Sequence, residues 1–363
     1  MKLSFSTFIR GQFAKQPPVV KGDLAGKTVI VLGANTGLGF EASKHFARMN
    51  PGRLILACRS QSRGDAALDR LKSATGYGKA ELWLIDLADF ESVKKFADKF
   101  ERDGGRLDIF VENAALSTRK YEATKDGWEA SLQVSDLSTP LLAFLLLPAM
   151  MRTAERYSTL PRLVVVASEV HHFTSIEKKV LERPDILKTL GSSAYCTKNN
   201  MTSRYFLTKR KLLLKPNVQS YAHQQDSAVL NILFVRAFNE RLPASTPLVI
   251  NAVNPGLCKT DLLRETQGIA ALIVGMILNI VAFTAEEGSR QLVFGALGNA
   301  DRPNDLRGEY LSACRVFEVS DFILSADGVK AQDQLWDELV DILGQVDSRV
   351  PEIVEKYFSS SKQ

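Results

Sequence analysis

The sequence predicts an α/β fold: a single doubly wound Rossmann domain on a parallel sheet. Short β-branched and apolar runs alternate with longer amphipathic stretches along the chain, which is typical of βαβ units. The apolar runs are continuous, as expected of strands that helices cover on both faces. The composition fits a globular fold, because 45% of the 363 residues are apolar and 24% are charged.

Seven segments are predicted to form strands, and amphipathic segments between them are predicted to form helices. The strands are expected at Thr28–Leu32, Arg53–Cys58, 81–85, 107–111, 163–167, 248–253 and 308–313. The helices are expected to include 39–49, 63–73, 90–101 and 128–151.

One domain accounts for most of the chain. We expect an N-terminal leader over 1–25, a domain over 26–350 and a C-terminal tail over 351–363. The first residues do not form a convincing signal peptide, because their apolar run is short and Arg10 ends it.

Charge and cysteine usage exclude several classes of protein. The chain has 46 basic and 41 acidic side chains, and this net charge of +5 is too small to indicate nucleic-acid binding. The four cysteines are far apart, without a CxxC pair or a histidine at ligand spacing, so we expect free thiols in a reduced compartment and no metal.

A glycine-rich turn follows the first predicted strand and opens a helix. Glycines at such a turn let the backbone approach a pyrophosphate, whose charge lies against the helix N-terminus. The cofactor-binding residues predicted here are Gly33, Asn35, Thr36, Gly37, Leu38 and Gly39.

The GxxxGxG spacing of this turn resembles the classical short-chain dehydrogenase/reductase family. The phrases LGANTGLGFEA, LACRS, VNPGLCKT and TAEEGSR are similar to its retinol-dehydrogenase-like branch, and most similar to fungal reductases, many of which serve secondary metabolism. The resemblance covers about 26–300. It implies a seven-stranded sheet in the order 3-2-1-4-5-6-7 and reversible hydride transfer between a nicotinamide and a carbonyl or alcohol carbon.

The resemblance also assigns residues to the ribose and to the adenine of the cofactor's adenosine. Family members often place a carboxylate after the second strand to hold the ribose of NAD, but this chain has Arg59 there. A guanidinium suits a 2′-phosphate, so NADP(H) is expected, with a solvated surface arginine as the alternative. Asp86 matches the acidic residue that contacts adenine, and it can also cap the following helix.

Four more residues match positions that lie near the nicotinamide in the family. Asn113 is expected to brace the central sheet, although Ala115 replaces the usual glycine two residues later. Pro255 and Gly256 resemble the turn that closes over the nicotinamide. Thr260 stands where family members contact the carboxamide or pyrophosphate.

The catalytic residues implied by the resemblance are Ser168, Tyr205, Lys209 and Ser135. Tyr205 and Lys209 form a YxxxK pair, and residues four apart share a helix face, so the ammonium lowers the phenol's pKa from its free value near 10. Ser168, at the end of the fifth strand, is expected to orient the substrate oxygen. Ser135 replaces the usual asparagine that supports the lysine through water, and slower turnover is expected.

The segment 261–285 corresponds to the family's variable substrate-covering region. Its apolar part, 268–285, indicates a lipophilic small-molecule substrate and forms either a buried or lid helix or a peripheral membrane contact. We expect a cytoplasmic location, with membrane association and a homodimer as open alternatives. His171 and His172 are expected on a loop or pocket rim.

The predicted function is therefore NADP(H)-dependent interconversion of a carbonyl and an alcohol on a lipophilic molecule, in terpenoid or polyketide biosynthesis. A non-catalytic NADP(H)-binding or scaffold protein is the alternative, and an epimerase or dehydratase of the same fold is a third reading.

Residues 210–228 interrupt the expected helix after Lys209. They are either a surface insertion or a retained intron. Codons for Arg210-Lys211-Leu212 can contain a splice donor, those for Ala222-His223 a branch-point-like element, and those for Ala228-Val229 an acceptor. The segment between this donor and this acceptor is 57 nucleotides long. Removing it would restore a continuous helical pattern after Lys209 and leave a chain of 344 residues.

Overall fold

The computed structural model describes residues 10–116, 118, 120–197, 224–259 and 281–358. Within them, eight strands form one sheet in the order β3-β2-β1-β4-β5-β6-β7-β8. Strands β1 to β7 are parallel and β8 is antiparallel to β7. The predicted Rossmann-type sheet and its order are confirmed, with one additional strand.

The strand bounds lie within two residues of most predictions. The strands are β1 Thr28–Leu32, β2 Arg53–Cys58, β3 Ala80–Leu84, β4 Ile109–Glu112, β5 Arg162–Val166, β6 Val249–Asn254, β7 Tyr310–Ser312 and β8 Arg315–Val316. The sequence does not predict β8, because its two exposed residues carry no apolar pattern.

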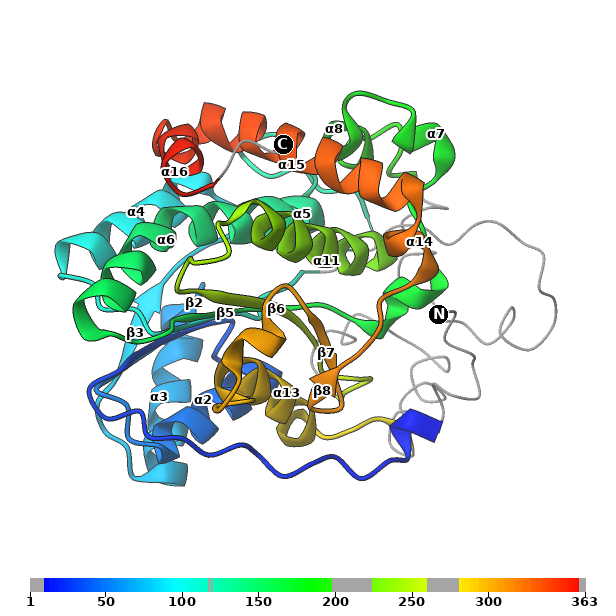
Figure 1. Cartoon of the computed structure of the whole chain (residues 1–363). Helices are drawn as coiled ribbons and strands as arrows, with labels where there is room; N and C mark the ends of the chain where they lie inside the picture. The colour runs from blue at the N-terminus through cyan, green and yellow to red at the C-terminus, as the bar shows by residue number, and fades with distance from the viewer. Residues whose placement is uncertain (1–9, 117, 119, 198–223, 260–280, 359–363) are drawn as a thin grey trace.

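Helices cover both faces of the sheet, as continuous apolar strands require. Figure 1 shows one layer containing α4 (Phe90–Arg102), α6 (Ser138–Tyr157), α11 (Gln224–Arg241), α15 (Ala326–Val346) and α16 (Arg349–Tyr357). The opposite layer contains α2 (Gly37–Arg48), α3 (Gln61–Thr75) and α13 (Ala285–Leu297). Shorter elements are α5 (Ala130–Leu132), η1 (Gln133–Leu137), η2 (Glu169–Phe173), α7 (Lys178–Leu181), α8 (Ile186–Leu190), η4 (Pro303–Leu306) and α14 (Asp321–Leu324).

The helix predicted over 128–151 contains an irregular turn. It begins as α5, passes through the π-helical turn η1 and continues as α6. Within the described part of the chain, 130–157 is the one helix long and apolar enough to cross a membrane, and 89% of its most apolar window is buried inside the fold. It is therefore a core helix.

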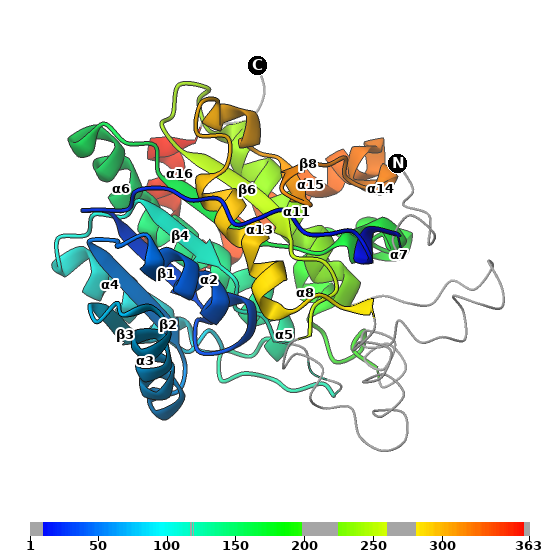
Figure 2. The ribbon, with the colours of Figure 1, turned by 90° about the horizontal axis from the view of Figure 1, so that it is seen from below.

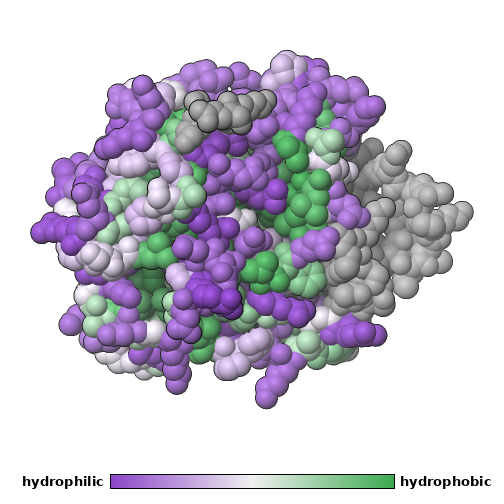
Figure 3. All heavy atoms as spheres, in the orientation of Figure 1, coloured by the Kyte–Doolittle hydropathy of each residue, from purple (hydrophilic) through white to green (hydrophobic). Residues whose placement is uncertain are grey.

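The apolar stretch 268–285 lies mostly outside the described residues, so neither its predicted helix nor its membrane contact is tested. On the face shown in Figure 3, hydrophilic side chains predominate over the described residues, and apolar ones form small separate groups.

Segments on the outer side of both predicted terminal boundaries pack against the domain. The described part of the leader runs beside α13, where Gln291 Nε2 donates to Gln16 Oε1 at 3.0 Å, and Leu24 is fully buried. Figure 2 shows this dark blue segment crossing α13. At the other end, the predicted tail contains most of α16, and Phe358 packs in the core cluster of the α11 layer.

Candidate functional site

The turn between β1 and α2 requires glycine at its two ends. Gly33 has a φ of +69°. A Cβ on Gly39 would lie 2.5 Å from both Gly33 O and Asn113 Nδ2. Backbone and amide therefore pack too closely for any side chain, as a dinucleotide-binding turn requires. Asn35 lies within the turn, Thr36 is the N-cap of α2, and Gly37 and Leu38 are in its first turn.

Arg70 is a cation at this turn that sequence reasoning missed. It extends from α3, and its Nη2 donates to the carbonyl of Asn35 at 2.7 Å. Its guanidinium lies 4.3 Å from the centroid of the Phe40 ring in α2. Arg70 thus fixes the middle of the turn and adds positive charge beside it. Its position on an amphipathic helix gives no sequence signal that distinguishes it from a solvated arginine.

Arg59 lies directly after β2, at the carboxyl edge of the sheet. Its side chain is exposed, and within the described residues no hydrogen bond or ion pair involves it. The next residue, Ser60, caps α3 by accepting from Arg63 N at 3.4 Å. The guanidinium is therefore available for an anion in solution.

Asp86 follows β3 beside Arg59, because β2 and β3 are adjacent strands. Asp86 Oδ1 accepts from Ala88 N at 3.0 Å, and Asp86 N donates to Ser92 Oγ at 2.9 Å. The alternative that Asp86 caps the next helix is wrong: Asp89 is the N-cap of α4 and accepts from Ser92 N at 3.3 Å. Asp86 shapes the preceding turn instead.

Asn113 connects the strands on either side of the centre of the sheet. Its Nδ2 donates to Leu32 O at 3.0 Å, at the end of β1, while Asn113 itself follows β4. This hydrogen bond links the ends of β4 and β1, whereas the role of Asn113 beside the cofactor stays a prediction. Ala115, the departure noted in the sequence, is exposed.

Glu112, the last residue of β4, is buried and was assigned no role from sequence. Neither of its carboxylate oxygens has a hydrogen-bond partner among the described residues, and burial raises its pKa well above the usual value. Burial without a hydrogen-bond partner therefore disfavours the charged form of Glu112.

Ser168 lies just beyond β5 and begins the 3-10 turn η2. Its Oγ accepts from Val170 N at 3.3 Å, so the hydroxyl is a weak cap that keeps its own hydrogen as a donor. His171 Nδ1 donates to the carbonyl of Ser168 at 2.7 Å, which fixes the backbone at this position.

The expectation that His171 and His172 lie on a loop or pocket rim is wrong. Both are buried in η2, with ring centroids 4.0 Å apart, and the ring of Tyr310 lies 4.6 Å from that of His171. Burial and the neighbouring His172 lower the pKa of His171 to about 3. His171 is therefore neutral, and the two rings pack together in η2.

Asn254 joins the Ser168 turn to the Pro255–Gly256 turn. Its Oδ1 accepts from Glu169 N at 3.2 Å and from Gly256 N at 3.0 Å. Gly256 has a φ of +75°, which favours glycine. The two turns predicted to contact substrate and nicotinamide are therefore held together by one amide.

Glu169 is a buried carboxyl in this junction. Gln12 Nε2, from the leader, donates to Glu169 Oε1 at 3.0 Å. Desolvation raises the pKa of Glu169 to about 7, against the opposing hydrogen bonds from Asn254 and Gln12. Sequence reasoning missed Gln12 because a residue ahead of the first strand gives no sign that it folds back.

This raised pKa predicts a pH-dependent loss of stability. The folded state binds the Glu169 proton more tightly than the unfolded state does. The free energy of unfolding should therefore fall by up to about 3 kcal/mol as the pH rises from 4.5 to about 7. Glu169→Gln should remove this component, whereas Glu355→Gln, at an exposed position, should retain it. Urea unfolding between pH 4.5 and about 7 measures the free energy of unfolding of each variant. The prediction fails if this free energy depends on pH in the same way for wild type and Glu169→Gln.

Ser135 lies in the π-helical turn η1 and is only 5% exposed. Its carbonyl accepts from Thr139 Oγ1 at 2.8 Å. Tyr205, Lys209 and Thr260 lie outside the described residues, so their predicted roles are untested. The described candidates occur where β1, β2, β3, β4, β5 and β6 end, at one edge of the sheet, and in the adjacent turn η1.

A doubly wound sheet with a glycine turn after its first strand defines the class of dinucleotide-binding α/β proteins. A sequence profile described as short chain dehydrogenase matches residues 27–177. The chain is 33% identical to the short chain dehydrogenase/reductase dmxR8 of Cryptosporiopsis sp. over 92% of its length and 95% of the relative's. The chain belongs to the short-chain dehydrogenase/reductase family, a family of oxidoreductases, and the resemblance seen in the sequence is confirmed.

Two further similarities agree with this family. The short chain dehydrogenase atnD of Emericella nidulans is 37% identical over 84% of this chain and 90% of the relative. Among solved structures, a short chain dehydrogenase from Shigella flexneri complexed with NADP superposes with a TM-score of 0.55. That match has 18% identity and covers 81% of this chain and 100% of the other, so it supports the fold.

Proposed function

We propose that this protein is an NADP(H)-dependent oxidoreductase that interconverts a carbonyl and an alcohol on a lipophilic small molecule. The observation that carries the proposal is the junction at Asn254, which holds Ser168 and the Pro255–Gly256 turn together at the edge where the glycine turn also lies. Ligands of doubly wound sheets bind at this edge.

The residues at this edge fit a phosphorylated dinucleotide. The close packing at Gly33 and Gly39 shapes the turn at the N-terminus of α2, where a pyrophosphate would bind, and Arg70 supplies positive charge near it. Arg59 would hold the 2′-phosphate through paired hydrogen bonds, and Asp86 would contact adenine. The NADP bound by the Shigella flexneri protein supports the same choice here.

The catalytic roles follow from the chemistry of the side chains. When bound, the cofactor supplies a hydride to the carbonyl carbon or accepts one from the alcohol carbon. Ser168 Oγ would donate a hydrogen bond to the substrate oxygen and orient it. In reduction, Tyr205 would give its phenolic proton to that oxygen. Lys209 would stabilise the phenolate, and Ser135 would hold the water that supports Lys209.

We infer an apolar substrate of terpenoid, polyketide or retinoid-like size. The apolar character of 268–285 supports this choice, because such a cover offers few groups that could orient a sugar. The fungal origin of the similar short chain dehydrogenases is consistent with secondary metabolism.

A panel of carbonyl compounds assayed by NADPH oxidation tests this function. We expect turnover of apolar ketones or aldehydes, and its loss in Tyr205→Phe, in whichever form of the chain, of 363 or 344 residues, turns over substrate. Activity confined to small hydrophilic carbonyls would overturn the substrate class. NADPH binding without any turnover, unaffected by Tyr205→Phe, would instead favour a non-catalytic binding protein.

Cofactor preference should depend on Arg59. Arg59→Asp should weaken NADPH binding at least tenfold, about 1.4 kcal/mol, because a carboxylate repels the 2′-phosphate. The matched control is Arg102→Asp, an exposed arginine at the end of α4, away from the carboxyl edge. Fluorescence titration with NADPH and NADH measures both variants. An unchanged preference for NADPH in Arg59→Asp would exclude Arg59 from the cofactor site.

A further inference from the structure

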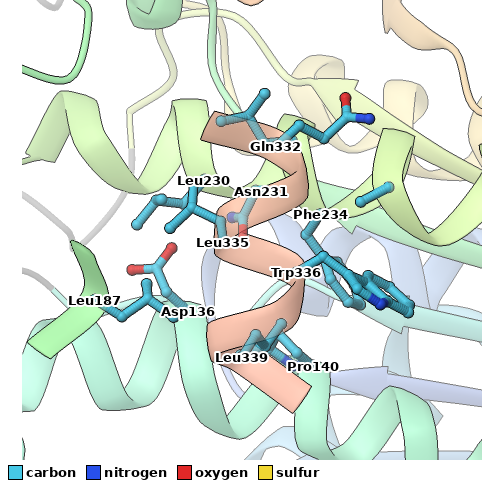
Figure 4. A pocket seen from close by; sticks show the side chains of 12 residues that line it. Asp136, Pro140, Leu187, Leu230, Asn231, Phe234, Gln332, Leu335, Trp336 and Leu339 are labelled. Atoms are coloured by element: carbon cyan, nitrogen blue, oxygen red, sulfur yellow. The ribbon is translucent and has the colours of Figure 1, made fainter. Parts of the chain in front are cut away.

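The start of α11 is anchored at the edge of the candidate site. Ser227 Oγ donates to Asp136 Oδ2 at 2.6 Å, and Asp136 is the neighbour of Ser135 in η1. One turn later, Asn231 Nδ2 donates to Val166 O at 3.1 Å, at the end of β5 and just ahead of Ser168. Figure 4 shows Asp136 between Leu187 and Leu230, facing α11.

Position 228 lies between these two anchors on the same side of the helix. Residues three or four apart on a helix are neighbours, so 228 is adjacent to 231, and backbone position 224 lies one turn earlier on the same face. Ala228 is 5% exposed. A tyrosine at 224 and a lysine at 228 would therefore have the four-residue spacing of a catalytic pair, between η1 and the end of β5.

The chain carries such a pair nineteen residues earlier, as Tyr205 and Lys209. Removing 210–228 would move Tyr205 to position 224 and Lys209 to position 228. The codons for Arg210-Lys211 can be CGT-AAG and those for Ala228-Val229 GCA-GTN, which supply GTAAG and CAG at the two ends of a 57-nucleotide intron. Joining the remaining C to TN makes a leucine codon.

After removal of 210–228, the new first turn of α11 would keep the contacts that this turn makes in the structure. Thr208 would take the place of Ser227 and provide the same hydroxyl for Asp136. The new leucine would take the place of Val229, which is fully buried, so an apolar side chain remains there. Positions 224 and 228 gain a phenol and an ammonium.

We propose that 210–228 are encoded by an intron, and that the mature enzyme carries Tyr205 and Lys209 on α11 at the positions of Gln224 and Ala228. The assignment of catalytic roles rests on the function proposed above, whereas the splice junction does not. A genuine surface insertion after Lys209 is the competing reading.

Sequencing of mature transcripts tests the junction directly. We expect transcripts shorter by 57 nucleotides that encode 344 residues. If every mature transcript keeps the segment, the intron is refuted, whatever activity the protein has. If the transcripts are short but the folded 344-residue protein binds NADPH without any turnover, the intron stands and the proposed oxidoreductase function fails.

A second experiment tests the position of the pair within the 363-residue chain. Gln224→Tyr combined with Ala228→Lys should raise kcat for an apolar carbonyl by about 100-fold over the unmodified chain, because it places an acid–base pair on α11. Gln224→Phe combined with Ala228→Lys is the matched control, because it lacks only the phenolic hydroxyl, and it should show no gain. In the 344-residue form, Tyr205→Phe should lose about 100-fold.

Some results with the double variants and with the unmodified 363-residue chain would contradict the proposal. Circular dichroism and NADPH fluorescence establish that both double variants fold and bind cofactor. Equal activity of the tyrosine and phenylalanine variants, with both folded, would show that position 224 is not the catalytic one. Full activity in the unmodified 363-residue chain that Tyr205→Phe abolishes would show that the inserted form is itself competent, which would also overturn the proposal.

Discussion

Replacing Ser168 by alanine should lower kcat by about 100-fold in the form of the chain that turns over substrate. In the proposed mechanism, the Ser168 hydroxyl is a preorganised donor toward the substrate oxygen, and removing one such donor costs about 100-fold or more. Its only described acceptor role is the weak cap of Val170 N at 3.3 Å, so the fold should tolerate the change. Steady-state kinetics and NADPH titration should show a loss in kcat without a loss of cofactor binding.

Two variants separate this catalytic role from the cap. Ser168→Thr keeps a hydroxyl and should retain most of the activity. Ser325→Ala removes a similar helix cap, since Ser325 Oγ accepts from Gly328 N at 3.1 Å at the start of α15, and it should leave kcat unchanged. Full activity in Ser168→Ala would show that the serine acts only as a cap.

The sequence predicted the sheet well because its strands are buried on both faces. For β1 and β2, whose residues are almost all buried, the predicted bounds agree with the structure. The glycine turn and the Asn113 brace could also be predicted, because only a particular residue type permits each close approach. The local sequence pattern was therefore enough to predict those features that depend on neighbouring residues in the sequence.

The remaining features depend on contacts between distant parts of the chain. Gln12 reaches Glu169 across 157 positions of sequence, and Arg70 reaches Asn35 across 35. The ring of His171 packs against that of Tyr310 on β7. Such pairings leave no periodic signal, so the leader was predicted to lie outside the domain and the histidines to lie on a rim.

A similar long-range contact involves α16, which runs past residue 351, where the sequence predicted the start of a tail. The apolar face of α16 is short, because Val350 and Ile353 are its buried residues, so its sequence resembles a frayed end. Its last contact comes from Phe358, whose ring centroid lies 4.7 Å from that of Phe238 on α11. Phe238 also meets the rings of Phe144 at 5.8 Å and Trp336 at 6.2 Å, so one ring joins α6, α11, α15 and the C-terminal segment.

Phe238→Ala should therefore destabilise the protein by about 3 to 5 kcal/mol, the usual cost of removing a buried ring from a packed core. Phe238 is fully buried, whereas Phe13 is 62% exposed, so Phe13→Ala makes the same chemical change without a cavity and should shift the free energy of unfolding by less than about 0.5 kcal/mol. Urea denaturation of both variants at one pH, with the wild type beside them, measures the difference. Equal stabilities for the two variants would mean that the aromatic cluster does not hold the C-terminal helices to α11. A large loss in Phe238→Ala alone would show that this ring cluster, which includes Phe144, Trp336 and Phe358, stabilises the fold.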